Sequence, residues 1–321
     1  MPELATGHTL PGRENMGGAA FEIMIEAEQR GFIAANLMPF RRVRKQASKF
    51  PTIPVEVFLK LLDLSRAPKG VYARDDWKFK TGSYSCEEYG FEDVLDDVEK
   101  DLYIDEFDAA IVGMERGTDK VLRGFEKRTA DLLMDTAVIT TTQAAAAVWS
   151  NQASATPRAD VIALKTKMRN NRGIIPNVGA MSYNTFQELL DTNAVTNKMQ
   201  YTNVIELANF EQQKRLMATY LTLDKIEVSN ALYDTAKKGQ TSTLTDIWPS
   251  TKVGLYRVSS GGDNIIEPVI GRTMLWDRYS ANELLVKAYR QEEINSDITR
   301  VAHYVDETII YAGAGGIITG I

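Results

Sequence analysis

The sequence predicts an α+β fold from three patterns. Apolar residues recur at spacings of three and four across 119–138, which predicts a long amphipathic helix. Aromatic and charged residues alternate across 77–81, which is typical of a strand. Short helical and strand patterns alternate across 175–262, and strand patterns dominate the remaining residues to the C-terminus. Helices and strands are therefore both expected to be major parts of the fold.

Length and composition exclude several classes of protein. The 321 residues exceed the usual size of one compact domain, so we expect two lobes or one lobe with long extensions. The hydrophobic fraction of 44% and the charged fraction of 25% argue against a disordered or collagen-like chain. A net charge of -6 disfavours a protein that grips duplex DNA, although a mildly acidic protein can line a container that holds DNA.

The cysteine count and the hydropathy pattern indicate where the chain folds. Cys86 is the single cysteine, so no intrachain disulfide can form, which fits folding in a reducing cytoplasm. No apolar run approaches the ~20 residues that cross a bilayer, so no membrane partner is expected. Residues 1–18 are polar and glycine-rich, carry no apolar signal core, and predict a loose arm.

A β-hairpin is predicted around an aromatic segment. Side chains alternate between aromatic or apolar and basic before Gly82 and Ser83, which supply a turn. A lone two-stranded hairpin is marginally stable in water, so this one must lie either on its own domain or on a neighbouring subunit. Its candidate contact residues are Trp77, Lys78, Phe79, Lys80 and Tyr84.

The remaining elements follow the same rules. Helix 19–37 is interrupted near Gly31 and ended by Pro39, and residues 49–64 form an extended connection with one short helix. Gly113, Gly117 and Gly124 weaken the approach to the long helix. Further helices are predicted at 161–170, which Gly173 ends, at 183–190, which Ser182 caps, and at 210–220. A polar loop is predicted at 259–264. Strands are predicted at 174–181, 226–228, 255–258, 284–290, 298–305 and 309–321.

Two runs of charge invite a functional interpretation. The acidic run 92–106 lacks the spacing of an EF-hand, so a solvated acidic face is favoured over a metal site. The basic run 41–49 could touch phosphate, but pairing with the acidic run of the same or a neighbouring chain is favoured. The candidates for an intersubunit salt network are Arg41, Arg42, Arg44, Asp93, Asp96, Asp97 and Glu99.

Catalytic chemistry finds little support. His8 and His303 are the only histidines, and zinc-site spacings are absent. A Cys86–His303 nucleophile pair is disfavoured because the predicted hairpin offers no helix N-terminus to lower the cysteine pKa. The glycine-rich stretch 313–316 lacks the third glycine of a dinucleotide loop. We therefore expect no catalytic residue, metal or cofactor, although a carboxylate-dependent enzyme needs no local motif.

The order of the elements resembles the Hong Kong 97 type fold of tailed-bacteriophage major capsid proteins. The resemblance rests on texture and order across nearly the whole chain, including 84–92, 176–190, 223–228, 244–248, 271–276 and 289–305. It implies an N-terminal arm (1–48), an extended β-hairpin loop (49–95), a peripheral domain with a long spine helix (96–174), an α/β axial domain (175–262) and return strands of the peripheral domain (263–321).

The same resemblance implies a function. The chain would be a structural protein that self-assembles through pentamers and hexamers into the icosahedral head of a virion, built in the host bacterial cytoplasm around double-stranded DNA that it contacts without sequence specificity. Portal, decoration and scaffolding proteins would be partners, the last separate because the arm is too short for a scaffolding domain. The alternatives are an encapsulin-like bacterial compartment shell and a cytosolic carboxylate-dependent α/β enzyme.

Overall fold

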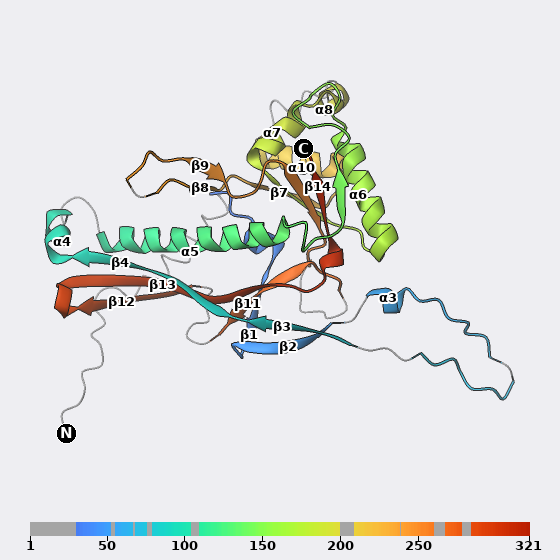
Figure 1. The fold of residues 1–321 in the computed structure, drawn as a ribbon, viewed down its shortest axis with the longest axis horizontal. Coiled ribbons are helices and arrows are strands. Elements are labelled where there is room, and N and C mark those ends of the chain that lie inside the picture. Colours follow the sequence, from blue (N-terminus) through green and yellow to red (C-terminus); the bar gives the residue numbers. More distant parts are fainter. Residues whose placement is uncertain are drawn as a thin grey trace.

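The computed structural model contains two five-stranded sheets joined by one long helix (Figure 1). None of the helices in the described ranges is long and apolar enough to cross a bilayer. The structure describes residues 30–52, 55–66, 68–75, 79–103, 109–199, 209–237, 239–259, 267–277 and 284–321.

The first sheet is organised around its longest strand, β13 (Ser296–Ile309). Strand β4 (Glu87–Asp96) pairs antiparallel along one edge of β13, with Tyr89 opposite His303. The other edge pairs antiparallel with β12 (Leu285–Gln291) and then β11 (Gly271–Trp276), beside which β1 (Phe40–Val43) runs parallel. The strands predicted at 284–290 and 298–305 are therefore confirmed to within a few residues, and β11 matches the segment 271–276 that the resemblance implied.

The long helix α5 (Ala109–Leu133) packs on β4 and β13. The prediction of 119–138 placed both of its ends too late. Its start was missed because Gly113 and Gly117 are poor helix formers, although both are buried where the helix approaches the sheet. It ends at Leu133 because the second sheet satisfies its last carbonyls: the Tyr256 hydroxyl donates to the Leu133 oxygen at 2.8 Å, and Lys252 Nζ to Met134 O at 2.9 Å.

The second sheet forms a lobe with its own core. Its order is β5 (Thr142–Ala144), β14 (Gly315–Thr319), β10 (Lys252–Tyr256), β6 (Val178–Ser182) and β7 (Lys225–Ser229). Its helices are α6 (Pro157–Arg172), α7 (Tyr183–Asp191), α8 (Asn193–Met199) and α10 (Phe210–Tyr220). A small hairpin, β8 (Leu232–Asp234) with β9 (Leu244–Asp246), projects from this lobe toward α5 (Figure 1).

The lobe confirms the predicted helix ends. Gly173 ends α6 in the left-handed conformation, with φ of 68°. The Ser182 hydroxyl accepts a hydrogen bond from the backbone N–H of Thr185 and so caps α7. Helix α10 has the predicted bounds of 210–220.

The C-terminal strand differs from expectation. We expected residues 263–321 to act together as return strands of the first sheet, but β14 lies inside the second sheet, between β5 and β10. Gly316 allows this because a Cβ there would come within 2.9 Å of Leu164 and Met168 of α6. Ile317 and Ile318 are then fully buried in the lobe.

The predicted hairpin turn at Gly82 and Ser83 is wrong. Both residues lie inside strand β3 (Lys80–Ser85), which pairs antiparallel with β2 (Ala47–Thr52) and continues past Cys86 into β4. Gly82 is opposite Phe50, whose ring occupies the space where a side chain on residue 82 would lie. Gly82 therefore allows β2 and β3 to approach each other closely. The two strands are connected by the chain between them and not by a turn at Gly82 and Ser83.

Candidate intersubunit surface

Between β2 and β3, the described residues expose most of their large apolar side chains. These residues, 55–66 and 68–75, are called the loop here and reach away from the body of the molecule (Figure 1). Leu61 is 97% exposed, Val71 82%, Leu64 76% and Tyr72 71%. Exposed apolar side chains so concentrated are typical of an interaction surface.

The base of the loop is fixed to the body. The short helix α3 (Val55–Phe58) carries Glu56, whose carboxylate accepts from the Tyr311 hydroxyl at 2.9 Å and from Arg172 Nη1 at 3.2 Å. Leu59 lies against Gly173, at the end of α6, where a side chain would not fit. These contacts set the direction in which the loop leaves the molecule.

Beyond its base, the loop is shaped by polar contacts with itself. Lys60 Nζ pairs with Asp75 at 2.9 Å across the loop. Arg66 Nε donates to the Gly70 oxygen at 2.6 Å, and its guanidinium lies 4.6 Å from the centre of the Tyr72 ring. The polar groups turn toward one another while the leucines face solvent, so the loop has a defined path without an apolar core.

The predicted hairpin residues lie beside this loop rather than at a turn. Phe79 is 56% exposed, and Lys80 is exposed at the start of β3. Tyr84 is half-buried and stacks on Phe50 of β2, with ring centres 6.4 Å apart. Trp77 and Lys78 lie outside the described residues. Tyr84 is therefore partly buried within the pair of strands β2 and β3. The exposed apolar residues of the loop, from Phe58 to Tyr72, were not predicted from the sequence.

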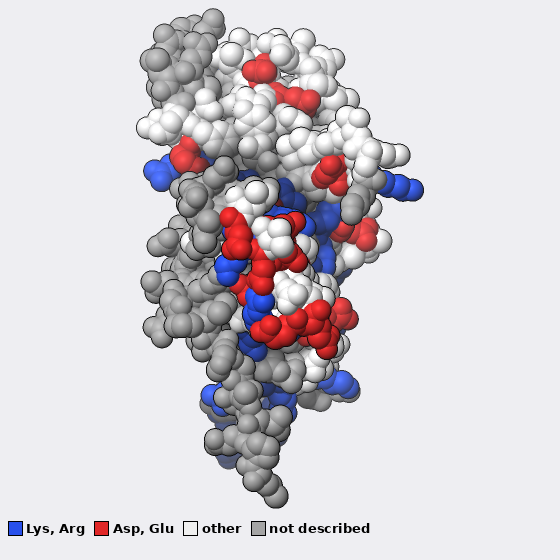
Figure 2. Space-filling view, turned by 90° about the vertical axis from the view of Figure 1, so that its left-hand side faces the viewer, with Lys and Arg blue, Asp and Glu red and all other residues white. Residues whose placement is uncertain are grey.

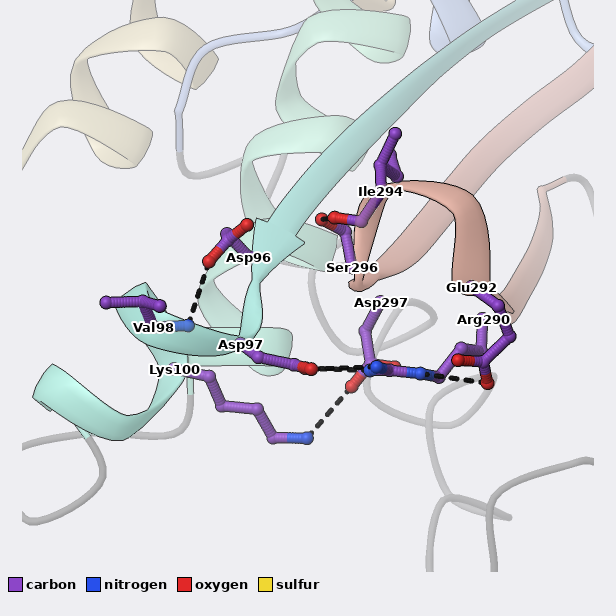
Figure 3. A network of polar contacts seen from close by, with 9 residues as sticks. All are labelled: Asp96, Asp97, Val98, Lys100, Arg290, Glu292, Ile294, Ser296 and Asp297. Atoms are coloured by element: carbon purple, nitrogen blue, oxygen red, sulfur yellow. Dashed lines mark hydrogen bonds and ion pairs between the residues drawn. The ribbon is translucent and has the colours of Figure 1, made fainter.

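The acidic run lies at the opposite end of the molecule, and helix α4 (Asp97–Tyr103) belongs to it. Arg290 of β12 holds the Asp97 carboxylate with both terminal nitrogens, each at 2.7 Å, and these hydrogen bonds lower the pKa of Asp97 (Figure 3). Lys100 pairs with Asp297 at 2.9 Å, and Asp96 accepts from the backbone N–H of Val98 at 2.8 Å.

The remaining charged candidates differ in exposure and in their ion-pair partners. Asp93 pairs with Arg116 of α5 at 3.3 Å, whereas Glu99 is exposed on α4. On the basic side, Arg42 is exposed in β1, and Arg44 is exposed just after it. Because β11 and β13 separate β1, which also holds Arg41, from β4, the sheet does not place the two runs side by side. A salt network between the runs of neighbouring chains stays a prediction.

Apolar side chains are exposed at this end too, which is called the tip here and comprises residues 94–102 with the 3₁₀ turn η1 (Glu292–Ile294). Val98 is 76% exposed, Leu102 70% and Val94 50%. Figure 2 views the molecule from this end and shows acidic side chains gathered there with a few basic ones among them. The tip thus exposes apolar side chains of β4 and α4 in acidic surroundings.

The one cysteine is unsuited to catalysis. Cys86 is fully buried, its Sγ lies 3.4 Å from the Met274 oxygen, and burial raises the pKa of its thiol to about 11. His303 is opposite Tyr89 on β4, three residues from Cys86, and burial lowers its pKa to about 3. Among the described residues, no cluster of three or more His, Cys, Asp or Glu side chains is placed to hold a metal ion.

Comparisons with known proteins identify the fold. No family model and no curated protein matches the sequence. A phage-related protein from Bordetella bronchiseptica is similar in structure, with a TM-score of 0.68 and 19% identity over 95% of this chain and 96% of that one.

Two further structures agree. A virus-like particle from Pyrococcus furiosus has a TM-score of 0.57 at 10% identity, covering 96% of this chain and all of that one. The capsid protein of cyanophage P-SCSP1u has a TM-score of 0.55 at 10% identity, covering 88% and 86%. Together with the element order, these similarities show that the chain has the Hong Kong 97 type capsid fold.

Proposed function

We propose that this chain is a structural major capsid protein of a tailed bacteriophage, which self-assembles through pentamers and hexamers into an icosahedral head enclosing double-stranded DNA. It would act in the virion without catalytic activity. The fold supports this proposal because it is shared with a cyanophage capsid protein. The observation that carries it is the exposure of Leu61, Leu64, Val71 and Tyr72 in the loop, which join none of the hydrophobic cores formed by the described residues.

The energetics of the loop favour burial against another subunit. Burying one exposed leucine or valine contributes about 1.5–3 kcal/mol. Leu61, Leu64, Val71 and Tyr72 are each more than two-thirds exposed, so their joint burial would contribute several kilocalories per mole. Contacts that are weak singly become stable when many close together, as a shell requires.

The loop and the tip suit a head-to-tail contact between copies. A closed ring or shell needs two different surfaces that fit each other, since each copy gives one and receives the other. The loop and the tip lie at opposite ends of the long axis (Figure 1). The tip is acidic and exposes Val98 and Leu102, while the loop offers apolar residues beside Lys60, Arg66, Lys69 and Arg74.

The two sheets would have separate places in the shell. The second lobe would be the axial domain, gathered around five- and six-fold axes, and the sheet under α5 would be the peripheral domain. The partners of the chain would be further copies of itself, scaffolding, portal and possible decoration proteins, and packaged DNA.

A loop variant tests the proposal. Leu61→Ser combined with Tyr72→Ser removes apolar surface that the single chain does not bury, so the variant should keep the wild-type circular dichroism spectrum and lose assembly. Leu244→Ser, 64% exposed on the β8–β9 hairpin, is the matched control and should still assemble. Deleting 78–86 is a poorer test because it would remove the fully buried Cys86.

Electron microscopy and sizing chromatography supply the readout. Wild-type protein should form shells or ring-shaped capsomers, and the loop variant should not. A persistently monomeric wild-type protein would overturn the proposal. Particles isolated from the producing bacterium that contain protein cargo and no nuclease-protected DNA would instead establish a compartment shell of the encapsulin kind.

A further inference from the structure

A buried carboxylate joins three segments that are far apart in sequence. Glu126 of α5 is 1% exposed. Its Oε1 accepts from the backbone N–H of Ile33 at 2.9 Å and from Trp248 Nε1 at 2.6 Å, and its Oε2 accepts from the N–H of Ala34 at 2.9 Å. One side chain therefore holds α2 (Ala34–Leu37) and the lobe on the long helix.

The segment that Glu126 holds is the one through which the chain emerges from residues 1–29. Besides Glu126, the Ser229 hydroxyl donates to the Gly31 oxygen at 2.9 Å, and the Thr273 hydroxyl donates to the Met38 oxygen at 2.9 Å. Gly31 has φ of 83° and leaves no room for a side chain against Asn230. Residues 31–38, called the anchor here, are thus inserted between α5, β7 and β11.

The charged groups around Glu126 do not neutralise a negative charge on its carboxylate. Glu227 of β7 is 4% exposed and raises the cost of a second negative charge nearby. Lys225 pairs with Glu227 at 2.5 Å, and no ion pair of Glu126 is found among the described residues. Several of the other ionisable groups on the surrounding elements have carboxylate or polar partners. Arg30 and Arg123 pair with Asp119, Lys127 with Asp131 and Arg128 with Glu307, while Asp246 accepts from Asn184 and Asp234 accepts from backbone N–H groups.

We propose that Glu126 holds a proton while the anchor is seated, and that losing this proton as pH rises to neutral and just beyond loosens the anchor from α5 and the lobe. An uncompensated charge is costly to bury, and the three N–H donors only partly offset that cost. Consistent with this, burial raises the pKa of Glu126 from 4.5 to about 7.

The sign of the effect follows from linkage. In the closed state the anchor is seated on Glu126, and in the open state it has left and Glu126 is exposed to water. The pKa of Glu126 then returns to 4.5, so the open state binds the proton more weakly than the closed state. The closed state is therefore favoured most at low pH and loses its advantage as pH rises toward 7. With these two pKa values, the opening equilibrium should increase about tenfold between pH 6 and pH 8.5.

Hydrogen exchange of the full chain tests the proposal. After correction for intrinsic exchange, protection of the anchor amides should fall about tenfold between pH 6 and pH 8.5, while peptides from α6 should not change. Glu126→Gln fixes a neutral side chain of the same shape and should abolish the dependence. Glu227→Gln removes the second carboxyl and should move the transition to lower pH.

Two results would overturn the proposal. One is wild-type protection of the anchor that stays constant or increases with pH. The other, which needs no variant to fold, is an infrared spectrum of wild-type protein without a carboxylic acid band that disappears between pH 6 and pH 8.5. Both readouts use the subunit itself, so they stand apart from the shell-forming test of the proposed function.

Discussion

Replacing Gly117 tests how α5 packs on the first sheet. Gly117 is buried, and a Cβ built there would lie 3.0 Å from Cγ2 of Val301, which is itself fully buried in β13. Gly124, two turns further along the same helix, would place its Cβ 3.5 Å from the end of the flexible Arg128 side chain. The two glycines therefore share a helix and differ in what faces them.

The expected magnitudes separate the two sites. Alanine is better than glycine in a helix interior by about 1 kcal/mol, and this gain applies to both. Overpacking a core costs about 1–3 kcal/mol, which applies to Gly117 alone. Gly124→Ala should therefore raise the free energy of unfolding by about 1 kcal/mol, whereas Gly117→Ala should leave it unchanged or lower it by up to about 2 kcal/mol.

Urea unfolding followed by circular dichroism measures the difference. Both substitutions are made in the Leu61→Ser, Tyr72→Ser background, so that assembly does not add to the free energy of unfolding. Gly117→Leu should destabilise further because its larger side chain must displace Val301 or Phe91. Equal stabilisation by the two alanine substitutions would refute the close contact between helix and sheet.

Two buried side chains give further predictions. Burial raises the pKa of the Cys86 thiol to about 11, so the native thiol should not react with iodoacetamide at pH 8 but should react fully in denaturant. Mass spectrometry counts the labelled thiols, and rapid labelling of the native protein would contradict the burial of Cys86. His303 has a pKa of about 3 against 6.5 when exposed, so the fold should lose stability as pH falls from 6.5 toward 3. His303→Gln should flatten that dependence in unfolding experiments across this range, and an unchanged slope would show that another group causes it.

Periodicity predicted the elements that are buried on one face. Helix α10 has the expected bounds, and Ser182 and Gly173 mark helix ends as their chemistry requires. These signals are local: a cap or a left-handed residue acts within one turn of its own position. They can be recognised without knowing the partner element.

The misassigned glycines show what local signals leave out. Gly117 counted against a helix and Gly82 in favour of a turn, because glycine is a poor helix former and a frequent turn residue. In the structure each glycine makes room for another element, β13 for Gly117 and Phe50 of β2 for Gly82. A close approach between segments distant in sequence has no signature in the sequence around either residue.

The candidate surface was hard to predict for a related reason. Exposure of Leu61 or Val98 cannot be inferred from a pattern, since an apolar residue in a sequence is ordinarily assigned to the core. Here the polar contacts of the loop, Lys60 with Asp75 and Arg66 with Gly70, hold a path that keeps its leucines in solvent. Such exposure would be selected against in a protein that stays alone, because large exposed apolar patches promote association. If the chain assembles as proposed, the exposed apolar residues of the loop would be buried against a second surface, and the apolar residues exposed at the opposite end of the same chain, Val98 and Leu102, offer one.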